Sequence, residues 1–151
     1  MKNNMFRGRY PYASDSKGRL SIPSKFREVL SADFHDERLV ITNFDNCLWA
    51  YPVAEWVKIE EKVAALPQFK EEVKALQRFF ISAATECPID KAGRILIPPT
   101  LRDYAGIQRD VVIVGMVRRI EIWAAERWKP IFEDAQSRLL SMGDKLADLG
   151  L

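Results

Sequence analysis

The chain has 151 residues, of which 48% are hydrophobic and 29% are charged, and its formal net charge is +2. This composition is typical of a globular protein and excludes a disordered chain, and the length suits one domain or two very small ones. The best apolar run, residues 111–117, is too short to cross a bilayer, so we expect no association with a membrane.

Charge is distributed unevenly along the chain. Residues 1–30 carry seven basic side chains against two acidic ones, a net charge of +5, which leaves −3 for the remainder. A basic segment on a nearly neutral protein predicts a local anionic partner. An ordinary solvated surface is the alternative interpretation at this stage.

The first elements predicted are a β-hairpin over residues 9–23 and a short helix over residues 23–30. Asp15 and Gly18 supply the turn of the hairpin, because glycine adopts positive φ without strain. Pro23 is expected at or near the first helical position, where a missing N–H costs nothing.

A strand pair and two helical segments follow in the first half. Strands are expected over residues 38–44 and 46–51, separated by a turn signal at residues 45–46. Residues 52–66 predict a helix whose apolar stripe is Trp56, Ile59, Val63 and Leu66. A second helix is expected over residues 68–80, with the stripe Phe69, Val73, Leu76 and Phe80.

The second half repeats this order. A strand, a turn and a strand are expected over residues 81–98, followed by a short helix over residues 98–106 that Gly106 closes. A strand pair (110–117 and 119–123) and a helix (124–142) complete it.

One motif is written twice. Residues 15–27 (DSKGRLSIPSKFR) recur 75 positions later as residues 90–102 (DKAGRILIPPTLR). The identical pairs are Asp15/Asp90, Gly18/Gly93, Arg19/Arg94, Ile22/Ile97, Pro23/Pro98 and Arg27/Arg102. From Tyr51/Trp123 onward the offset is 72, so the first half carries three extra residues between its short helix and its strand pair. The pattern predicts two tandem ββαββα units.

Each unit is too small to bury both faces of its own sheet. Two copies bury those faces against each other, so we predict an α+β protein, mainly β with flanking helices, whose repeats form one closed, pseudo-twofold β-barrel. The expected boundaries are repeats at 5–52 and 81–124, linking helices at 53–80, and a C-terminal helix and tail at 125–151.

The D-x-x-G-R turn predicts a rigid display of one arginine in each repeat. Its aspartate can accept hydrogen bonds from the amides that follow, and its glycine allows a tight reversal. A guanidinium group suits phosphate or the O6/N7 edge of guanine. Arg19 and Arg94 would lie side by side on a ribbon narrow enough to enter a major groove. Alternatively, the Asp15–Arg19 and Asp90–Arg94 pairs are plain salt bridges that close a turn.

Other residues with chemical potential are expected to be structural. Arg27 and Arg102 lie in the short helices, where they would pack their stems and pair with neighbouring acids. His35 lies in a polar loop, and Cys47 and Cys87 lack metal-ligand spacing. No motif of a nucleophile or phosphate loop occurs. We therefore expect no enzyme, catalytic residue, metal, cofactor or small-molecule substrate, and a reducing, cytoplasmic location.

The repeated motif D-x-x-G-R-[LI]-x-I-P-x-x-x-R resembles the signature of the SpoVT/AbrB-like, or swapped-hairpin, domains. The tandem arrangement resembles the MraZ family of bacterial transcriptional regulators. Supporting segments run along the whole chain: MFRGRY (5–10), CLWAYPVAEW (47–56), TECPIDKAGRILIPPTLRDYAGI (85–107) and VGMVRRIEIWAAERW (114–128).

The resemblance implies a double-split barrel and a repressor that binds short repeated boxes of double-stranded DNA. It implies action at its own promoter, upstream of cell-division and cell-wall genes, nucleoid localisation, and a ring-shaped homo-oligomer, an octamer or dodecamer. The family's D-x-x-x-R motif maps onto residues 15–19 and 90–94. The predicted DNA-binding residues are Asp15, Lys17, Arg19, Asp90, Lys91, Arg94 and, for phosphate contacts, Arg9.

Two departures from symmetry and from the family accompany this prediction. Lys17 aligns with Ala92 and Ser16 with Lys91, so the two loops need not contact DNA equally. Met1–Asn4 precede the opening typical of the family. The candidates for an oligomer interface are Phe69, Phe79, Phe80, Trp128, Ile131 and Phe132, with capping of the barrel core as the alternative.

The competing function is a protein-interaction module, because related swapped-hairpin domains occur in antitoxins that grip a toxin with a disordered acidic tail. The tail of this chain, residues 141–151, is short and partly apolar, which disfavours that role.

Overall fold

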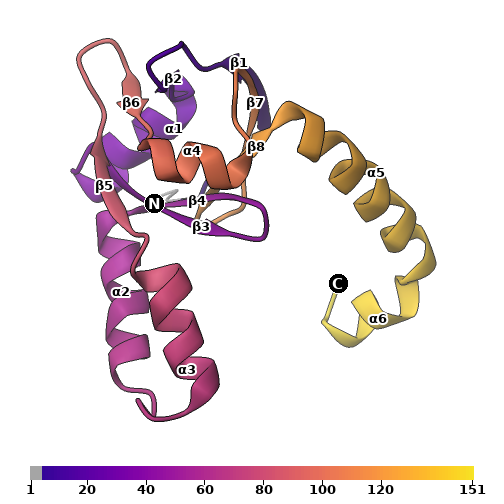
Figure 1. Ribbon diagram of the computed structural model, residues 1–151. Coiled ribbons are helices and arrows are strands. Elements are labelled where there is room, and N and C mark those ends of the chain that lie inside the picture. The colour runs from indigo at the N-terminus through magenta and orange to yellow at the C-terminus, as the bar shows by residue number, and fades with distance from the viewer. Residues whose placement is uncertain (1–4) are drawn as a thin grey trace.

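The computed structural model describes residues 5–151 and shows a strand-rich body with two helical projections (Figure 1). A six-stranded antiparallel sheet has the order β1–β7–β8–β4–β3–β5, and β2 and β6 form a separate two-stranded antiparallel ribbon. The strands are β1 (Arg9–Ala13), β2 (Arg19–Ser21), β3 (Arg38–Phe44), β4 (Cys47–Pro52), β5 (Thr85–Pro88), β6 (Arg94–Leu96), β7 (Asp110–Gly115) and β8 (Ile120–Ala124). The predicted fold class is confirmed, although sheet and ribbon are two ladders and no single ladder closes the barrel within residues 5–151.

A pseudo-twofold axis relates the two halves and passes through both ladders. Leu20 in the ribbon pairs with Ile95, its own counterpart 75 positions on. Trp49 in the sheet pairs with Glu121, its counterpart 72 positions on. The sheet order is also unchanged when every strand is exchanged for its counterpart and read from the other edge. Two copies of one unit therefore build both ladders together.

The predicted hairpin over residues 9–23 needs correction. Its turn forms, since the Asp15 N–H donates to the Arg19 carbonyl over 3.0 Å, but the strands on either side join different ladders. β1 pairs with β7 of the second half, and β2 pairs with β6. In the same way β5 pairs with β3 of the first half. Each half thus completes its sheet with a strand from the other half, an exchange that local sequence does not show.

Proline residues mark the start of two short helices, and a glycine marks the end of one of them. Pro23 and Pro98 are the N-cap residues of α1 and α4, and Gly106 closes α4 at φ 68°. The three extra residues of the first half lie where predicted, because α1 continues into a π-helical turn, η1, whereas α4 ends at once. The helical segments are α1 (Ser24–Val29), η1 (Leu30–Phe34), α2 (Val53–Ala64), α3 (Glu71–Leu76), η2 (Gln77–Ile81), α4 (Pro99–Ala105), α5 (Ala125–Ser141) and α6 (Gly143–Asp148).

The main hydrophobic core lies between the sheet and the ribbon. β-branched and leucine side chains from both halves fill it, and burial of this apolar surface is the dominant force that holds the halves together. Its largest fully buried side chains are Phe6, Leu20, Ile22, Phe26, Leu30, Leu39, Ile41, Leu48, Ile95, Ile97, Ile113 and Ile120.

The helical hairpin of α2, α3 and η2 forms one projection and packs around a small aromatic cluster. Trp56 and Phe80 are buried there, with ring centroids 5.4 Å apart. The predicted stripes are wrong at the tip of this hairpin: Phe69 is 91% exposed, and Leu66 lies beyond the end of α2 and is also exposed. No helix within residues 5–151 is long and apolar enough to cross a membrane. The predicted extension, Met1–Asn4, lies outside the described residues.

Candidate nucleic-acid interface

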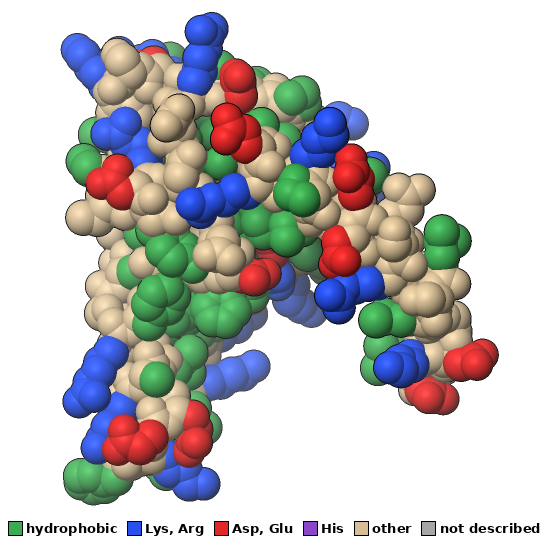
Figure 2. All heavy atoms as spheres, turned by 45° about the vertical axis from the view of Figure 1, so that its right-hand side comes forward, with side chains coloured by type: hydrophobic (Ala, Val, Ile, Leu, Met, Phe, Trp, Pro, Cys, Tyr) green, Lys and Arg blue, Asp and Glu red, His purple; other side chains and the backbone are tan. Residues whose placement is uncertain are grey.

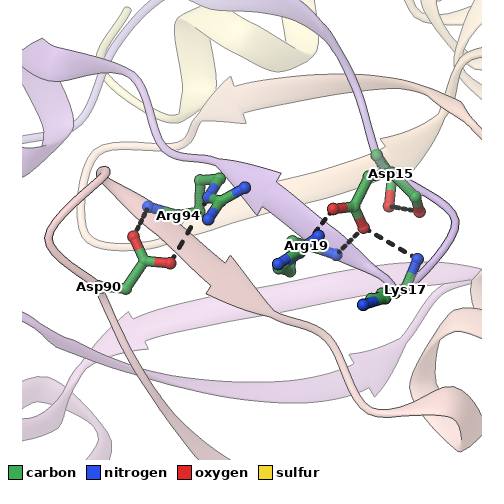
Figure 3. Close-up of polar contacts among 6 residues, drawn as sticks. Asp15, Lys17, Arg19, Asp90 and Arg94 are labelled. Carbon is green, nitrogen blue, oxygen red and sulfur yellow. Dashed lines mark hydrogen bonds and ion pairs between the residues drawn. The ribbon is translucent and has the colours of Figure 1, made fainter.

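The β2–β6 ribbon has an inner and an outer face. Side chains alternate along a strand, and the paired residues Leu20 and Ile95 point into the core, where both are buried. Arg19 and Arg94 therefore belong to the outer face. Their side chains are 39% and 36% exposed, and they lie near each other on neighbouring strands (Figure 3). The ribbon thus displays the two guanidinium groups on one side of the molecule.

The first turn is built around the Asp15 carboxylate. Its Oδ1 accepts hydrogen bonds from the backbone N–H groups of Lys17 and Arg19, at 2.9 and 2.8 Å. Its Oδ2 accepts a third from Arg19 Nε, at 2.6 Å. The amide of Arg19, together with its guanidinium and the amide of Lys17, lowers the pKa of the Asp15 carboxyl to about 2. Asp15 is therefore ionised at neutral pH and holds both the turn and the guanidinium group of Arg19.

The second turn has the same backbone but a looser ion pair. Asp90 Oδ1 accepts hydrogen bonds from the N–H groups of Ala92 and Arg94, at 2.8 and 3.0 Å. The amide of Arg94, followed by that of Ala92, lowers the pKa of the Asp90 carboxyl. Arg94 Nε lies 3.5 Å from Asp90 Oδ2 and makes no hydrogen bond within residues 5–151. The predicted turn chemistry is confirmed, and the salt bridges of the alternative interpretation are also present.

These ion pairs leave the Nη groups of both arginines available for a ligand. In each pair the contact runs through Nε, and the described residues offer no hydrogen bond to either Nη group of Arg19 or Arg94. The Nη groups form the end of the guanidinium fork that recognises phosphate or a guanine edge. A salt bridge to the turn and contact with a ligand are therefore compatible functions of one side chain.

Each turn is also held by the opposite repeat. The Ile97 N–H donates to the Gly18 carbonyl over 3.0 Å, and the Ile22 N–H donates to the Gly93 carbonyl over 2.9 Å. Both glycines have positive φ, 87° for Gly18 and 79° for Gly93. Backbone reversals of this type favour glycine because it has no Cβ.

Arg27 and Arg102 cover these glycines reciprocally. A Cβ on Gly18 would lie 2.7 Å from Arg102 Nε, and a Cβ on Gly93 would lie 2.9 Å from Arg27 Cζ. Arg27 Nε also donates to the Ile22 carbonyl over 3.1 Å. Both arginines thus pack against the turn of the other repeat. The predicted pairing with the adjacent acids is wrong, because the described residues show no such ion pair.

Arg9 is the predicted residue that the structure separates from the others. It begins β1, at the end remote from the first turn, and its guanidinium lies 4.5 Å from the centroid of the Phe132 ring in α5. Lys17 and Lys91 are exposed beside the two turns, where an anionic backbone could reach them.

The comparisons with known proteins match both halves of the chain to one family. Two segments, residues 5–79 and 80–148, match the family described as "MraZ protein, putative antitoxin-like", and each contains one D-x-x-G-R turn. The chain belongs to the MraZ family. The resemblance inferred from the repeated motif is confirmed.

Full-length relatives support the same assignment. A protein of Natranaerobius thermophilus is 42% identical over 147 residues, and one of Desulfitobacterium hafniense is 44% identical over 148 residues. In both cases the match covers 97% of this chain and the whole relative, which is named "Transcriptional regulator MraZ". A third, from Heliobacterium modesticaldum, has the same name and is 44% identical.

Sequence reasoning missed two features of this MraZ-family site. The first is that Arg27 and Arg102 each cover the turn of the other repeat. Their recurrence in the motif marks both arginines, but no pattern along one chain reveals which turn each of them covers. Ser21 and Leu96 are the other residues of the outer face. Because they differ between the repeats, the repeated motif gives no signal for them.

Cys47, Cys87 and His35 are the residues considered for an enzyme or a metal site. Burial raises the pKa of the Cys47 thiol and raises that of the Cys87 thiol to about 11, so both thiols favour the protonated form. Between residues 5 and 151, no group of three His, Cys, Asp or Glu side chains is placed to hold a metal ion. His35 ends η1 with φ 53°.

Proposed function

We propose that this protein is a sequence-specific, DNA-binding transcriptional regulator whose reading element is the β2–β6 ribbon. The observation that carries the proposal is the placement of Arg19 and Arg94 on one outer face, each oriented by a turn aspartate. Two strands lie about 4.8 Å apart, so the ribbon fits a major groove about 12 Å wide. Membership of a family whose relatives are named transcriptional regulators supports the same conclusion.

The roles of the other predicted residues follow from their positions. Lys17 and Lys91 flank the ribbon and would neutralise phosphates, which position a protein without specifying a sequence. Asp15 and Asp90 would act as positioning residues, because they orient the arginines and hold the turn. The family resemblance supports repression at the protein's own promoter, among cell-division and cell-wall genes, through short repeated boxes, and a nucleoid-associated location.

A homo-oligomer is part of the proposal, and the C-terminal arm supports it. Helix α5 has 17 residues and buries none of them, and it leaves the body as a second projection (Figure 1). Figure 2 shows this arm and the helical hairpin standing apart, with hydrophobic side chains gathered on the upper part of the hairpin. Exposed apolar residues on the two projections include Leu66, Phe69, Phe79, Ile131, Leu139 and Leu140.

A second copy of the chain would cover these apolar positions, because removing apolar surface from water lowers the free energy. Phe69, Phe79 and Ile131 keep their place as interface candidates, and Trp128 and Phe132 are half-buried, 5.9 Å apart between ring centroids. Phe80 is buried in the aromatic cluster, apart from the main core, and so leaves the list of interface candidates. A ring of eight or twelve subunits, as the resemblance implies, would place many ribbons on successive boxes and raise the effective concentration of each.

The test is DNA selection followed by substitution of the two arginines. Arg19→Ala and Arg94→Ala should each weaken binding to the selected duplex by about 1–3 kcal/mol, and the double variant should lose specific binding. Arg78→Ala is the matched control, because it removes one exposed arginine from the helical hairpin, away from the ribbon. Circular dichroism and native mass should stay unchanged in all variants, and binding should weaken steeply with salt.

A double variant that binds the selected duplex like the wild type would overturn the site assignment. A pull-down that returned one stoichiometric protein partner and no DNA would favour the antitoxin-like interaction module instead.

A further inference from the structure

The outer face of the ribbon carries an apolar residue between its charges. Leu96 lies directly opposite Arg19 in the ladder and is 58% exposed, whereas its neighbours Ile95 and Ile97 are buried in the core. Its counterpart in the first repeat is Ser21, which lies opposite Arg94. The ribbon is therefore symmetric in backbone and in its arginines, but one arginine faces a leucine and the other faces a serine.

The isobutyl group of Leu96 lies on the face that we propose enters the major groove, where few groups of DNA are apolar. In a major groove the base edges present hydrogen-bond donors and acceptors, and the thymine C5-methyl is the apolar group among them. Side chains directly opposite each other in an antiparallel pair have Cβ atoms about 5 Å apart. Successive base pairs are spaced by about 3.4 Å. Leu96 and Arg19 can therefore reach neighbouring positions of one DNA site.

A second copy of the chain is a poorer occupant of this face. Arg19 and Arg94 flank Leu96, and a surface that covered the leucine would also have to neutralise two guanidinium groups. A second ribbon would bring like charges together. The anionic groove of DNA satisfies the arginines and the leucine at once.

We propose that Leu96 is a specificity-determining residue that contacts the C5-methyl group of a thymine next to the base read by Arg19. This inference rests on the proposed function and adds an orientation to it. Ser21, on the other side of the pseudo-twofold axis, presents a hydroxyl group, which is compatible with a hydrogen-bonding base edge. Each ribbon therefore reads its box in one direction, although its scaffold is nearly symmetric.

Replacement of thymine by deoxyuridine tests the contact, since it removes only the methyl group. The intact protein is titrated with the selected duplex and with copies in which one thymine at a time becomes deoxyuridine, and Kd is measured by fluorescence anisotropy. For the wild type, one position should show a loss of about three- to fivefold, the effect expected of one buried methyl group. Leu96→Ala should bind the thymine and deoxyuridine duplexes equally at that position.

Ser21→Ala is the matched control, because it truncates the counterpart residue and should keep the full methyl effect. Both variants change exposed or half-exposed side chains, so their melting temperature and native mass should equal those of the wild type. The inference is overturned if Leu96→Ala retains the methyl effect, if no position shows one, or if Leu96→Ala changes the oligomer mass, which would assign the leucine to a contact between copies.

Failure of the proposed function looks different. In that case the wild type selects no duplex, or the Arg19 and Arg94 variants bind the selected duplex unchanged. If the wild type binds specifically through both arginines, but its Kd is unchanged by removal of any thymine methyl group, only the proposed role of Leu96 is overturned.

Discussion

The two D-x-x-G-R turns of this protein share one backbone and differ in their side chains. In both, an aspartate Oδ1 accepts the amides two and four residues on, and a glycine with positive φ makes the reversal. The ion pairs differ, at 2.6 Å between Arg19 and Asp15 but 3.5 Å between Arg94 and Asp90. Their surroundings differ too, since Lys17 aligns with Ala92 and Ser21 with Leu96.

The comparison separates what holds a turn from what the turn displays. The glycines, the aspartates and the covering arginines, Arg27 and Arg102, make contacts that any side-chain change would disturb. Residues on the outer face make few contacts within the chain, so they can differ without loss of the scaffold. A tandem repeat thereby presents two different sets of side chains on the same turn backbone. Two identical subunits cannot do so, because their side chains are the same.

Separation of the halves should have the largest effect, because it removes most of the strand pairing. Within one half, only the β3–β4 or β7–β8 pair remains, and an isolated two-stranded hairpin is marginally stable in water. Fragments 1–79 and 80–151 should each fail to fold as monomers, and a mixture of the two should regain the cooperative unfolding of the whole chain. The folding of each fragment and of the mixture is measured by thermal denaturation followed by circular dichroism at several concentrations. Sedimentation gives the mass of each species.

A fragment that stayed monomeric and melted cooperatively at a temperature independent of concentration would contradict the exchange of strands. A fragment that folds only as a dimer is compatible with it, because a true twofold axis would then replace the pseudo-twofold one.

Substitution of the turn glycines should have the next largest effect and should be equal in the two turns. Gly18→Ala and Gly93→Ala each add a Cβ at positive φ that lies under 3.0 Å from a covering arginine. The expected loss is roughly 2–4 kcal/mol of the free energy of unfolding, from backbone strain and overpacking together. Urea denaturation of both variants measures it.

Gly150→Ala is the control for this pair, because Gly150 has φ 85° but no atom within 4 Å of the added Cβ. It should change the stability of the body by less than about 0.5 kcal/mol. Addition of Arg102→Ala to Gly18→Ala should recover the steric part of the loss. Unequal losses in the two turns would mean that the frame is less symmetric than its hydrogen bonds indicate.

Titration of the turn aspartates should show the smallest difference. The folded protein lowers the pKa of Asp15 to about 2 and also lowers that of Asp90. Each turn is therefore stabilised by its carboxylate above the ordinary pKa of aspartate, about 3.9, and loses this contribution as the pH falls through the lowered value. Because Asp15 has the shorter ion pair, its carboxyl carbon should titrate at a lower pH than that of Asp90 in an NMR experiment.

Asp15→Asn and Asp90→Asn should each abolish one of these titrations and leave the other in place. If both carboxyl groups titrated near 3.9, the hydrogen bonds to their Oδ1 atoms would be absent in solution.

Much of this protein could be inferred from its residues alone, because the signals are local. The repeat of residues 15–27 at 90–102, the glycine reversals, the proline helix starts and the alternation of β2 and β6 each depend on a few neighbouring positions. These signals sufficed for the family, the fold class and the pair of displayed arginines.

The tertiary structure alone decided which strands pair, which turn each of Arg27 and Arg102 covers, and where Arg9 and Phe69 lie. Strand partners are chosen by burial of a shared core between segments that lie far apart in the chain, from 44 residues for Ile41 and Thr85 to 105 residues for Arg9 and Val114. A strand's own pattern records its buried face but not its neighbour. The position of Leu96 beside Arg19 is a product of that pairing, and it makes the outer face of the ribbon asymmetric.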